Sequence, residues 1–100
     1  MKGIYLDDER SPKTDRNWTI VRNYDEFVGE IEANGVPDFI SLDHDLGEER
    51  SGKDCLSWFI NHCQDRGIPL KTVEFNVHSA NPIGAANMWS LWQCVLKFEG

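Results

Sequence analysis

The segment DHD at residues 43–45 places an imidazole between two carboxylates, directly after the apolar segment 39–42. Such crowding is costly unless a cation or a proton transfer makes use of the groups. A polar loop with a helix-capping aspartate is the alternative interpretation. We favour a functional site, because two other apolar segments of the sequence also end in polar or ionisable side chains.

The other two segments are residues 3–6 and 71–79. The carboxyl ends of parallel strands meet at one edge of a sheet, where open α/β sheets bind their ligands. If all three segments are strands of such a sheet, their terminal side chains converge. Besides Asp43, His44 and Asp45, these side chains are Asp7, Asp8, Glu9 and Arg10 at the first segment and His78, Ser79 and Asn81 at the last.

Two histidines in this set suit acid–base chemistry near neutral pH. One imidazole of a pair at neighbouring strand ends can accept a proton while the other donates one. We predict His44 and His78 as that catalytic pair, with Asp43 or Asp45 orienting one of the rings. The third histidine, His62, falls on the polar face of a helix, where we expect it to be solvated.

The acidic side chains allow a second interpretation. Three carboxylates at the ends of neighbouring strands repel one another unless a cation or a proton neutralises them. Mg²⁺ binds through one or two carboxylates together with waters and phosphate oxygens, so Asp7, Asp8 and Asp43 are candidate metal ligands. Neutralisation by the histidines and Arg10 is the alternative, and the sequence leaves both open.

Phosphate oxygens can bind at the same edge. We predict Arg10 and Lys53 as the bases that offset their charge. Ser79, Asn81 and the backbone N–H groups that open the last two helices are the predicted hydrogen-bond donors. Ser79 and Asn81 are equally suited to capping the last helix, which begins with Pro82.

Periodicity predicts the elements that position these residues. Apolar side chains recur at helical spacing in three segments, and β-branched, aromatic and other apolar residues form four short runs. The order β-β-α-β-α-β-α is typical of a parallel α/β sheet, here in a single domain of residues 1–100. The expected strands are 3–6, 18–22, 39–42 and 71–79, and the expected helices are 24–34, 52–66 and one that starts at 82.

Composition excludes several classes of function. With 17 acidic and 10 basic residues the formal charge is −7, which disfavours tight binding to the bulk of a nucleic acid. No apolar run has membrane length, and the N-terminus lacks the apolar core of a signal peptide. The three cysteines have no metal-type spacing, so we interpret them as small core residues of a cytoplasmic protein.

The segments LDDER, PDFISLDHDLG, SGKD and VHSANPIG together resemble the family of cyclic-phosphate processing receiver domains over nearly the whole chain. The resemblance implies a small receiver-like (flavodoxin-like) α/β fold with a mainly parallel four-stranded sheet in the order 2-1-3-4. The acidic pair of parent receivers corresponds to Asp7 and Asp8, and their phosphoacceptor corresponds to Asp43. Their Ser/Thr-Ala pair corresponds to Ser79 and Ala80.

The sequence departs from ordinary receivers. A loop replaces the helix between the first two strands, so the second strand could run antiparallel. The fifth strand, which carries a catalytic lysine, and the fifth helix have no counterpart, whereas His44 and His78 are additions. These departures argue against ordinary phospho-switch signalling.

Right-handed crossovers place helices 24–34 and 52–66 on the same face of the sheet. The other face would lack the helices that a receiver has there. We expect it to be covered either by the final helix, through Trp89 and Trp92, or by a second subunit or another protein.

Two functions remain. The resemblance implies a phosphoesterase that processes cyclic phosphates, such as the 2′,3′-cyclic phosphate ends of nucleotides or RNA, with His44 and His78 as its acid–base pair. The alternative is a non-catalytic receiver-like module that binds a phosphoryl group or a protein partner.

Overall fold

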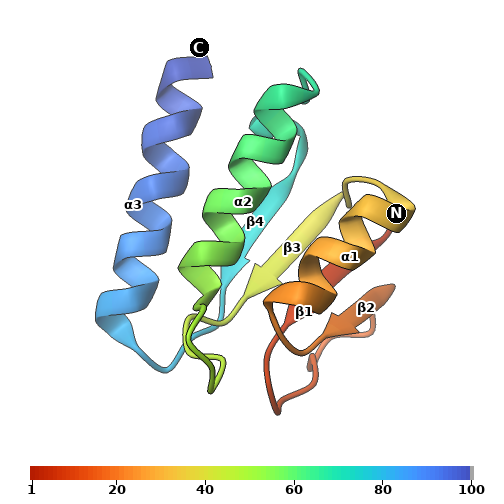
Figure 1. Ribbon diagram of the computed structural model, residues 1–100, viewed down its shortest axis with the longest axis vertical. Coiled ribbons are helices and arrows are strands. Elements are labelled where there is room, and N and C mark those ends of the chain that lie inside the picture. Colours follow the sequence, from red (N-terminus) through yellow and green to blue (C-terminus); the bar gives the residue numbers. More distant parts are fainter. Residues whose placement is uncertain (100) are drawn as a thin grey trace.

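The computed structural model describes residues 1–99 as one four-stranded sheet with three helices (Figure 1). All strand pairs are parallel and the order is β2-β1-β3-β4, which confirms the expected receiver-like α/β fold. The strands are β1 (Gly3–Leu6), β2 (Trp18–Val21), β3 (Phe39–Leu42) and β4 (Glu74–Val77), and the helices are α1 (Tyr24–Asn34), α2 (Gly52–Asp65) and α3 (Pro82–Glu99).

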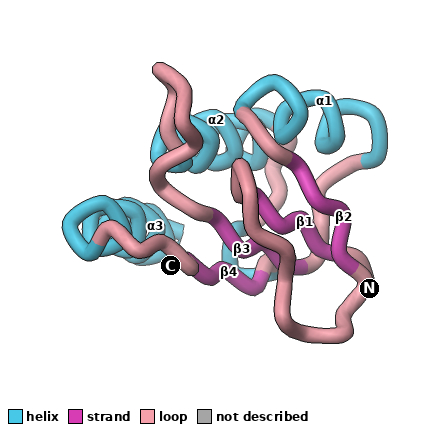
Figure 2. The backbone as a smooth tube through the Cα atoms, turned by 90° about the horizontal axis from the view of Figure 1, so that it is seen from below, coloured by secondary structure: helices cyan, strands magenta, loops and turns pink. Residues whose placement is uncertain are grey.

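Strand β2 runs parallel to β1, the direction that the sequence left open. A parallel pair requires the chain to return along the full strand, about 13 Å for a short strand at about 3.3 Å per residue. Residues 7–17 make this return as a loop. Their extended reach, more than about 30 Å, makes a helical crossover unnecessary. The loop runs on the face of the sheet that lies away from α1 and α2 (Figure 2).

Helices α1 and α2 lie side by side on one face of the sheet, as right-handed crossovers predict (Figure 2). Helix α2 begins with the predicted capping arrangement, in which Asp54 accepts the Ser51 N–H at 2.7 Å. The core fills the space between these helices and the sheet. Its fully buried members include Leu6, Phe27, Leu42, Leu56 and Phe59.

Helix α3 lies at the β4 edge of the sheet beside α2 (Figure 2). Trp92 stacks on Phe75 of β4 with 4.4 Å between ring centroids, and on Phe59 of α2 with 6.4 Å. Trp89 contacts the edge of the same Phe75 ring. The final helix therefore does not cover the opposite face, because both tryptophans pack with the core on the helical side. Among residues 1–99, no helix has the length and apolar character needed to cross a membrane.

Two local expectations need correction. Strand β4 is shorter than predicted, because Leu70–Thr72 form a 3-10 turn in which Thr72 N–H and Oγ1 both donate to Pro69 O. His62 is buried instead of solvated, because its ring stacks on Trp58 with 4.7 Å between centroids.

The cysteines divide into two groups. Cys55 and Cys63 lie in the core, where burial raises the pKa of their thiols to about 12 and about 11. Cys94 is exposed on α3. The prediction of small core residues is confirmed for the first two and is wrong for the third.

Candidate functional site at the carboxyl edge of the sheet

Asp7, Asp43 and His78 form one row across the sheet, each one residue beyond the end of its strand. Their backbone N–H groups still bond to the neighbouring strand, at 2.9 to 3.1 Å. Because side chains alternate along a strand, and the residues before them face the core, this row faces away from the helices. The sheet ladder therefore fixes the positions of two carboxylates and one imidazole.

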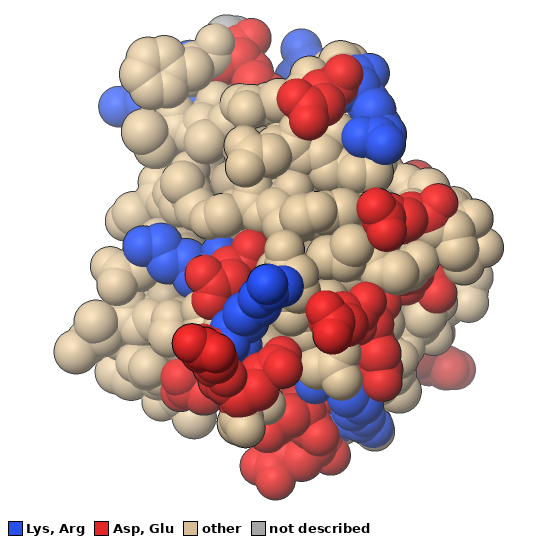
Figure 3. All heavy atoms as spheres, in the orientation of Figure 1, with Lys and Arg blue, Asp and Glu red and all other residues tan. Residues whose placement is uncertain are grey.

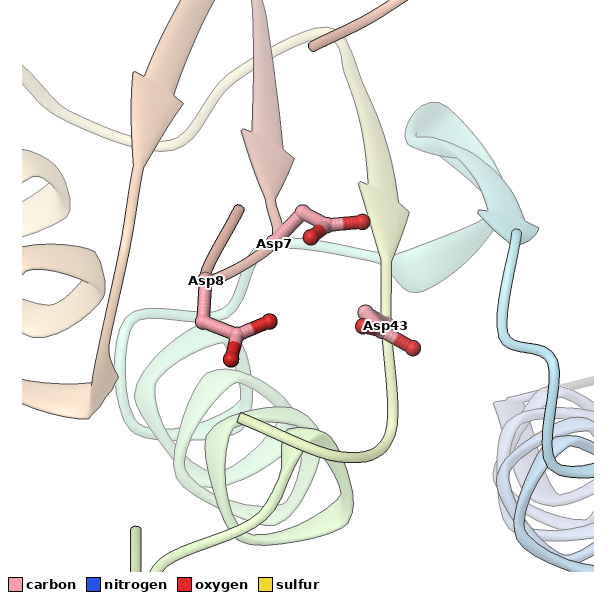
Figure 4. Close-up of side chains that lie close together, drawn as sticks. All are labelled: Asp7, Asp8 and Asp43. Carbon is pink, nitrogen blue, oxygen red and sulfur yellow. The ribbon is translucent and has the colours of Figure 1, made fainter. Parts of the chain in front are cut away.

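The carboxylates of Asp7, Asp8 and Asp43 approach one another at this edge (Figure 4), each offering an oxygen within 4.8 Å of the others. Asp7 is fully buried. Its Oδ1 accepts the N–H groups of Glu9 and Arg10 at 3.0 and 2.9 Å, and its Oδ2 accepts Arg10 Nε at 2.8 Å. The same guanidinium reaches within 3.5 Å of Asp43 Oδ2, so Arg10 bridges two strand ends.

Asp7 is ionised in spite of its burial. Desolvation raises the pKa of this carboxyl, but the N–H groups of Arg10 and Glu9 and the Arg10 guanidinium outweigh it and hold the pKa below its usual range. Arg22 supports the pair from the other side, since its Nη1 donates to the carbonyl oxygens of Asp7 at 3.1 Å and Arg10 at 2.7 Å. Asp7 and Arg10 thus form a fixed ion pair.

His78 has a partner at each ring nitrogen. Nε2 lies 3.1 Å from Asp7 Oδ2, and Nδ1 lies 2.7 Å from Ser41 Oγ. Because Asn76 Nδ2 already donates to Ser41 Oγ at 3.2 Å, we assign the Ser41 proton to the bond with Nδ1 and the ring proton to Nε2. The Tyr5 ring stacks on the imidazole with 4.2 Å between centroids, which fixes the plane of the ring.

Burial lowers the pKa of His78, and this effect exceeds the opposing influence of the Asp7 and Asp43 carboxylates. The imidazole is therefore mainly neutral at pH 7, the form that can accept a proton.

His44 belongs to a neighbouring group. Its ring packs against Gly84 in the first turn of α3, where an added Cβ atom would lie 2.5 Å from His44 Cγ. Its Nδ1 lies 2.9 Å from Asp45 Oδ1, and this hydrogen bond is the main reason why the pKa of Asp45 is lowered. Within residues 1–99 no hydrogen bond joins the two imidazoles, so the structure brings His78 to Asp7 and Asp43, and His44 to Asp45.

The structure places the predicted phosphate-binding residues in different surroundings, and only one of them lies beside the carboxylates. Asn81 Oδ1 accepts the Gly84 N–H at 3.0 Å, so Asn81 caps α3. Ser79 Oγ accepts the Asn81 N–H at 3.0 Å in the turn that precedes the helix. Lys53 lies exposed in the first turn of α2 and takes part in none of the ion pairs found among residues 1–99. Arg10 is the predicted base that the structure places beside the carboxylates.

A second row of side chains, two residues before the first on each strand, is not among the residues predicted from the sequence. Its members support or contact His78 and face the same side of the sheet. The period-two alternation of strands, counted back from the first row, would have identified them. They are Tyr5, Ser41 and Asn76, which are partners in the strand register.

A cavity of about 350 Å³ opens beside the carboxylates and is lined by Asp8, Arg10, Asp43 and Asp45 among others. Asp and Glu side chains gather around this end of the molecule, at the bottom of Figure 3. Such a surface disfavours the many phosphates of a long nucleic acid. Arg10 nevertheless offers one local positive charge to a single phosphate.

The carboxylates also fit a divalent cation. Arg10 pairs with Asp7 and also reaches Asp43, so one positive charge faces three carboxylates. Asp8 takes part in none of the ion pairs found among residues 1–99. One oxygen of Asp43 is taken by the His44 N–H, and Asp8 is exposed. Asp8 and Asp43 would therefore hold Mg²⁺, with waters and phosphate oxygens completing its shell. A bound cation would neutralise charge on a phosphate.

We expect Mg²⁺ to raise the melting temperature by several degrees. A concentration ten times the dissociation constant contributes about 1.4 kcal/mol, and each kcal/mol shifts the midpoint of a domain of this size by about 4–8 °C. The rise should disappear in Asp8→Asn and persist in Asp15→Asn, a control in the same loop. An identical midpoint in Mg²⁺ and in EDTA would show that Arg10 and the hydrogen bonds of the protein stabilise the cluster without a cation.

A parallel α/β sheet with clustered carboxylates at the ends of neighbouring strands defines a receiver-like domain. The family model described as Cyclic-phosphate processing Receiver domain matches residues 2–93. The chain therefore belongs to that family. No curated protein and no solved structure matched the chain.

Proposed function

We propose that this protein is a phosphoesterase that opens cyclic phosphates, of the 2′,3′ type found at the ends of nucleotides or RNA. The observation that carries the proposal is the row of Asp7, Asp43 and His78 with Arg10 bridging its carboxylates. This row supplies a neutral imidazole, oriented by a buried carboxylate, next to a cation that suits a phosphate oxygen. The family match supports cyclic phosphate as the group processed.

In the proposed reaction water attacks phosphorus, and the bond from phosphorus to one ribose oxygen breaks. The Ser41 hydroxyl takes the proton of the attacking water and passes its own proton to Nδ1 of His78, while Asp7 stabilises the resulting imidazolium through Nε2. His44, which is hydrogen-bonded to Asp45 through Nδ1, protonates the leaving ribose oxygen. The product is a phosphate monoester with one free hydroxyl.

A second function is favoured by one observation. Asp7 and His78 have all their side-chain polar atoms paired within the protein, as a purely structural network would. A non-catalytic module that binds a phosphoryl group or a protein is therefore the competing proposal. For either function we propose a cytoplasmic protein, because its three thiols are free.

The test is to incubate the purified protein with 2′,3′-cyclic nucleotides and with RNA that ends in a cyclic phosphate. We expect a monoester product and a rise in KM in Arg10→Ala that is absent in Arg66→Ala, a control at the far end of α2. Binding of these substrates without turnover would support the module instead. Turnover that survives both His44→Ala and His78→Ala would contradict the acid–base assignment.

A further inference from the structure

A second cavity, of about 560 Å³, lies on the face of the sheet opposite α1 and α2. We call it the open-face cavity. The sheet forms its floor, and the loop of residues 7–17 forms the opposite wall through residues 10–14 and 16. Its volume is in the range of small-molecule sites, which bury most of their ligand in a concave, largely preformed pocket.

The open-face cavity has aromatic rings in one wall and polar side chains on its floor. Tyr5 and Trp18 lie edge to face, with 5.6 Å between ring centroids, and both line the cavity. Ser41 and Asn76 lie on the floor beside them. Asn76 is exposed and uses one amide hydrogen on Ser41, so its carbonyl oxygen and its second amide hydrogen are open to a ligand. Aromatic surface beside a donor and an acceptor suits a flat heterocycle with a polar edge.

The lining of this cavity is richer in basic side chains than the protein as a whole. Three basic side chains line it, Arg10, Lys13 and Arg16, and one acidic side chain, Glu74, in a chain with a net charge of −7. Arg16 pairs with Glu74 at 2.7 Å and closes one end of the cavity. Arg10, at the other end, also lines the carboxylate cavity, so its guanidinium lies where the two cavities meet.

We propose that the open-face cavity binds the nucleobase of a nucleotide whose phosphate lies at Arg10. The inference rests on the proposed function for the place of the phosphate, and it adds a binding site for the base of the nucleotide. The base stacks on Trp18, the half-buried ring of the aromatic wall, since Tyr5 is buried and already stacks on His78. The free amide groups of Asn76 bond to the edge of the base. Trp18 Nε1 donates to Thr14 Oγ1 at 3.0 Å, which ties the loop wall to the aromatic wall and holds the cavity open for the base.

Binding of a product-type ligand tests this proposal without any turnover. Calorimetric titration would compare adenosine and uridine 3′-monophosphate with 1-O-methylribose 3-phosphate, which has no base, and with inorganic phosphate. Loss of a stacked base weakens binding by about tenfold or more. We therefore expect at least one of the two nucleotides to bind about tenfold tighter than the base-free phosphate. Equal affinity of the nucleotides and the base-free phosphate would overturn the proposal.

Substitutions test whether the preference for the nucleotide arises in the open-face cavity. Trp18→Ala and Asn76→Ala should remove the preference for the nucleotide and leave the affinity for inorganic phosphate unchanged. Trp89→Ala and Asn61→Ala are the matched controls on the helices, and circular dichroism would confirm that each variant is folded. A preference that survives both cavity variants would also overturn the proposal. Equally fast opening of the cyclic phosphate of 1-O-methylribose and of a cyclic nucleotide would contradict this inference but leave the proposed function intact.

Discussion

Replacing His78 by alanine is expected to lower the rate of cyclic phosphate opening about 10²- to 10⁴-fold, the usual contribution of a positioned acid or base. His78 is mainly neutral at pH 7 and is hydrogen-bonded to Asp7 through Nε2 and to the Ser41 hydroxyl through Nδ1, so it is the proton acceptor in the proposed reaction. The measurement is kcat with a 2′,3′-cyclic nucleotide at saturating concentration.

His62 provides the control for that experiment. It is also buried and also stacks on an aromatic ring, but it lies on α2 away from the row of Asp7, Asp43 and His78. His62→Ala should lower the melting temperature with little change in kcat. If His62→Ala and His78→Ala reduced kcat equally, the loss would reflect general destabilisation, and the catalytic assignment of His78 would be wrong.

The second large effect concerns stability. Gly52 opens α2 directly beneath the site, and a Cβ atom at this position would lie 1.7 Å from the carbonyl oxygen of Asp43. That oxygen belongs to the backbone and cannot rotate away, so Gly52→Ala must displace either α2 or the end of β3. Overpacking of this kind costs about 1–3 kcal/mol or more, and we expect the melting temperature to fall by about 10 °C.

Gly29 is the matched comparison for Gly52. It lies within α1, and a Cβ atom there would meet nothing within 4 Å. Gly29→Ala should therefore stabilise the helix by about 0.5–1 kcal/mol and raise the melting temperature by a few degrees. Thermal unfolding of both variants and the wild type would measure the two predicted shifts in melting temperature. An unchanged midpoint in Gly52→Ala would mean that α2 does not pack against Asp43 as closely as described.

The convergence of Asp7, Asp43 and His78 was predictable from the sequence because it depends on simple rules. Parallel strands of equal length end at one edge, and the residue after each strand end falls on a definite face. The same alternation explains why the predicted pairing of His44 with His78 is not seen as a contact. His44 follows Asp43 directly, so its ring lies against Gly84 of α3 and not over the open face. Although His44 follows Asp43 in the sequence, its side chain therefore does not join the row that contains Asp43.

Other features depend on tertiary packing that local patterns do not record. The direction of β2 was open because a loop as long as residues 7–17 can serve a parallel or an antiparallel strand. The position of α3 was open because its apolar stripe fits either face of the sheet, and Trp92 stacking on Phe75 and Phe59 decides it. The burial of His62 depends on the nearby ring of Trp58, which lies one turn before it on the same helix.

The loop of residues 7–17 is anchored at both ends and near its middle. Arg22 holds the carbonyl oxygens of Asp7 and Arg10 at one end, Asn17 O accepts the Gly3 N–H at the other, and Trp18 Nε1 binds Thr14. Between these anchors, residues 11–13 carry no part of the sheet ladder. Insertions at such a surface position cost little closure entropy. Residues 11–13 line the open-face cavity, so changes in this short segment are expected to alter the selectivity of the proposed base site on an unchanged scaffold.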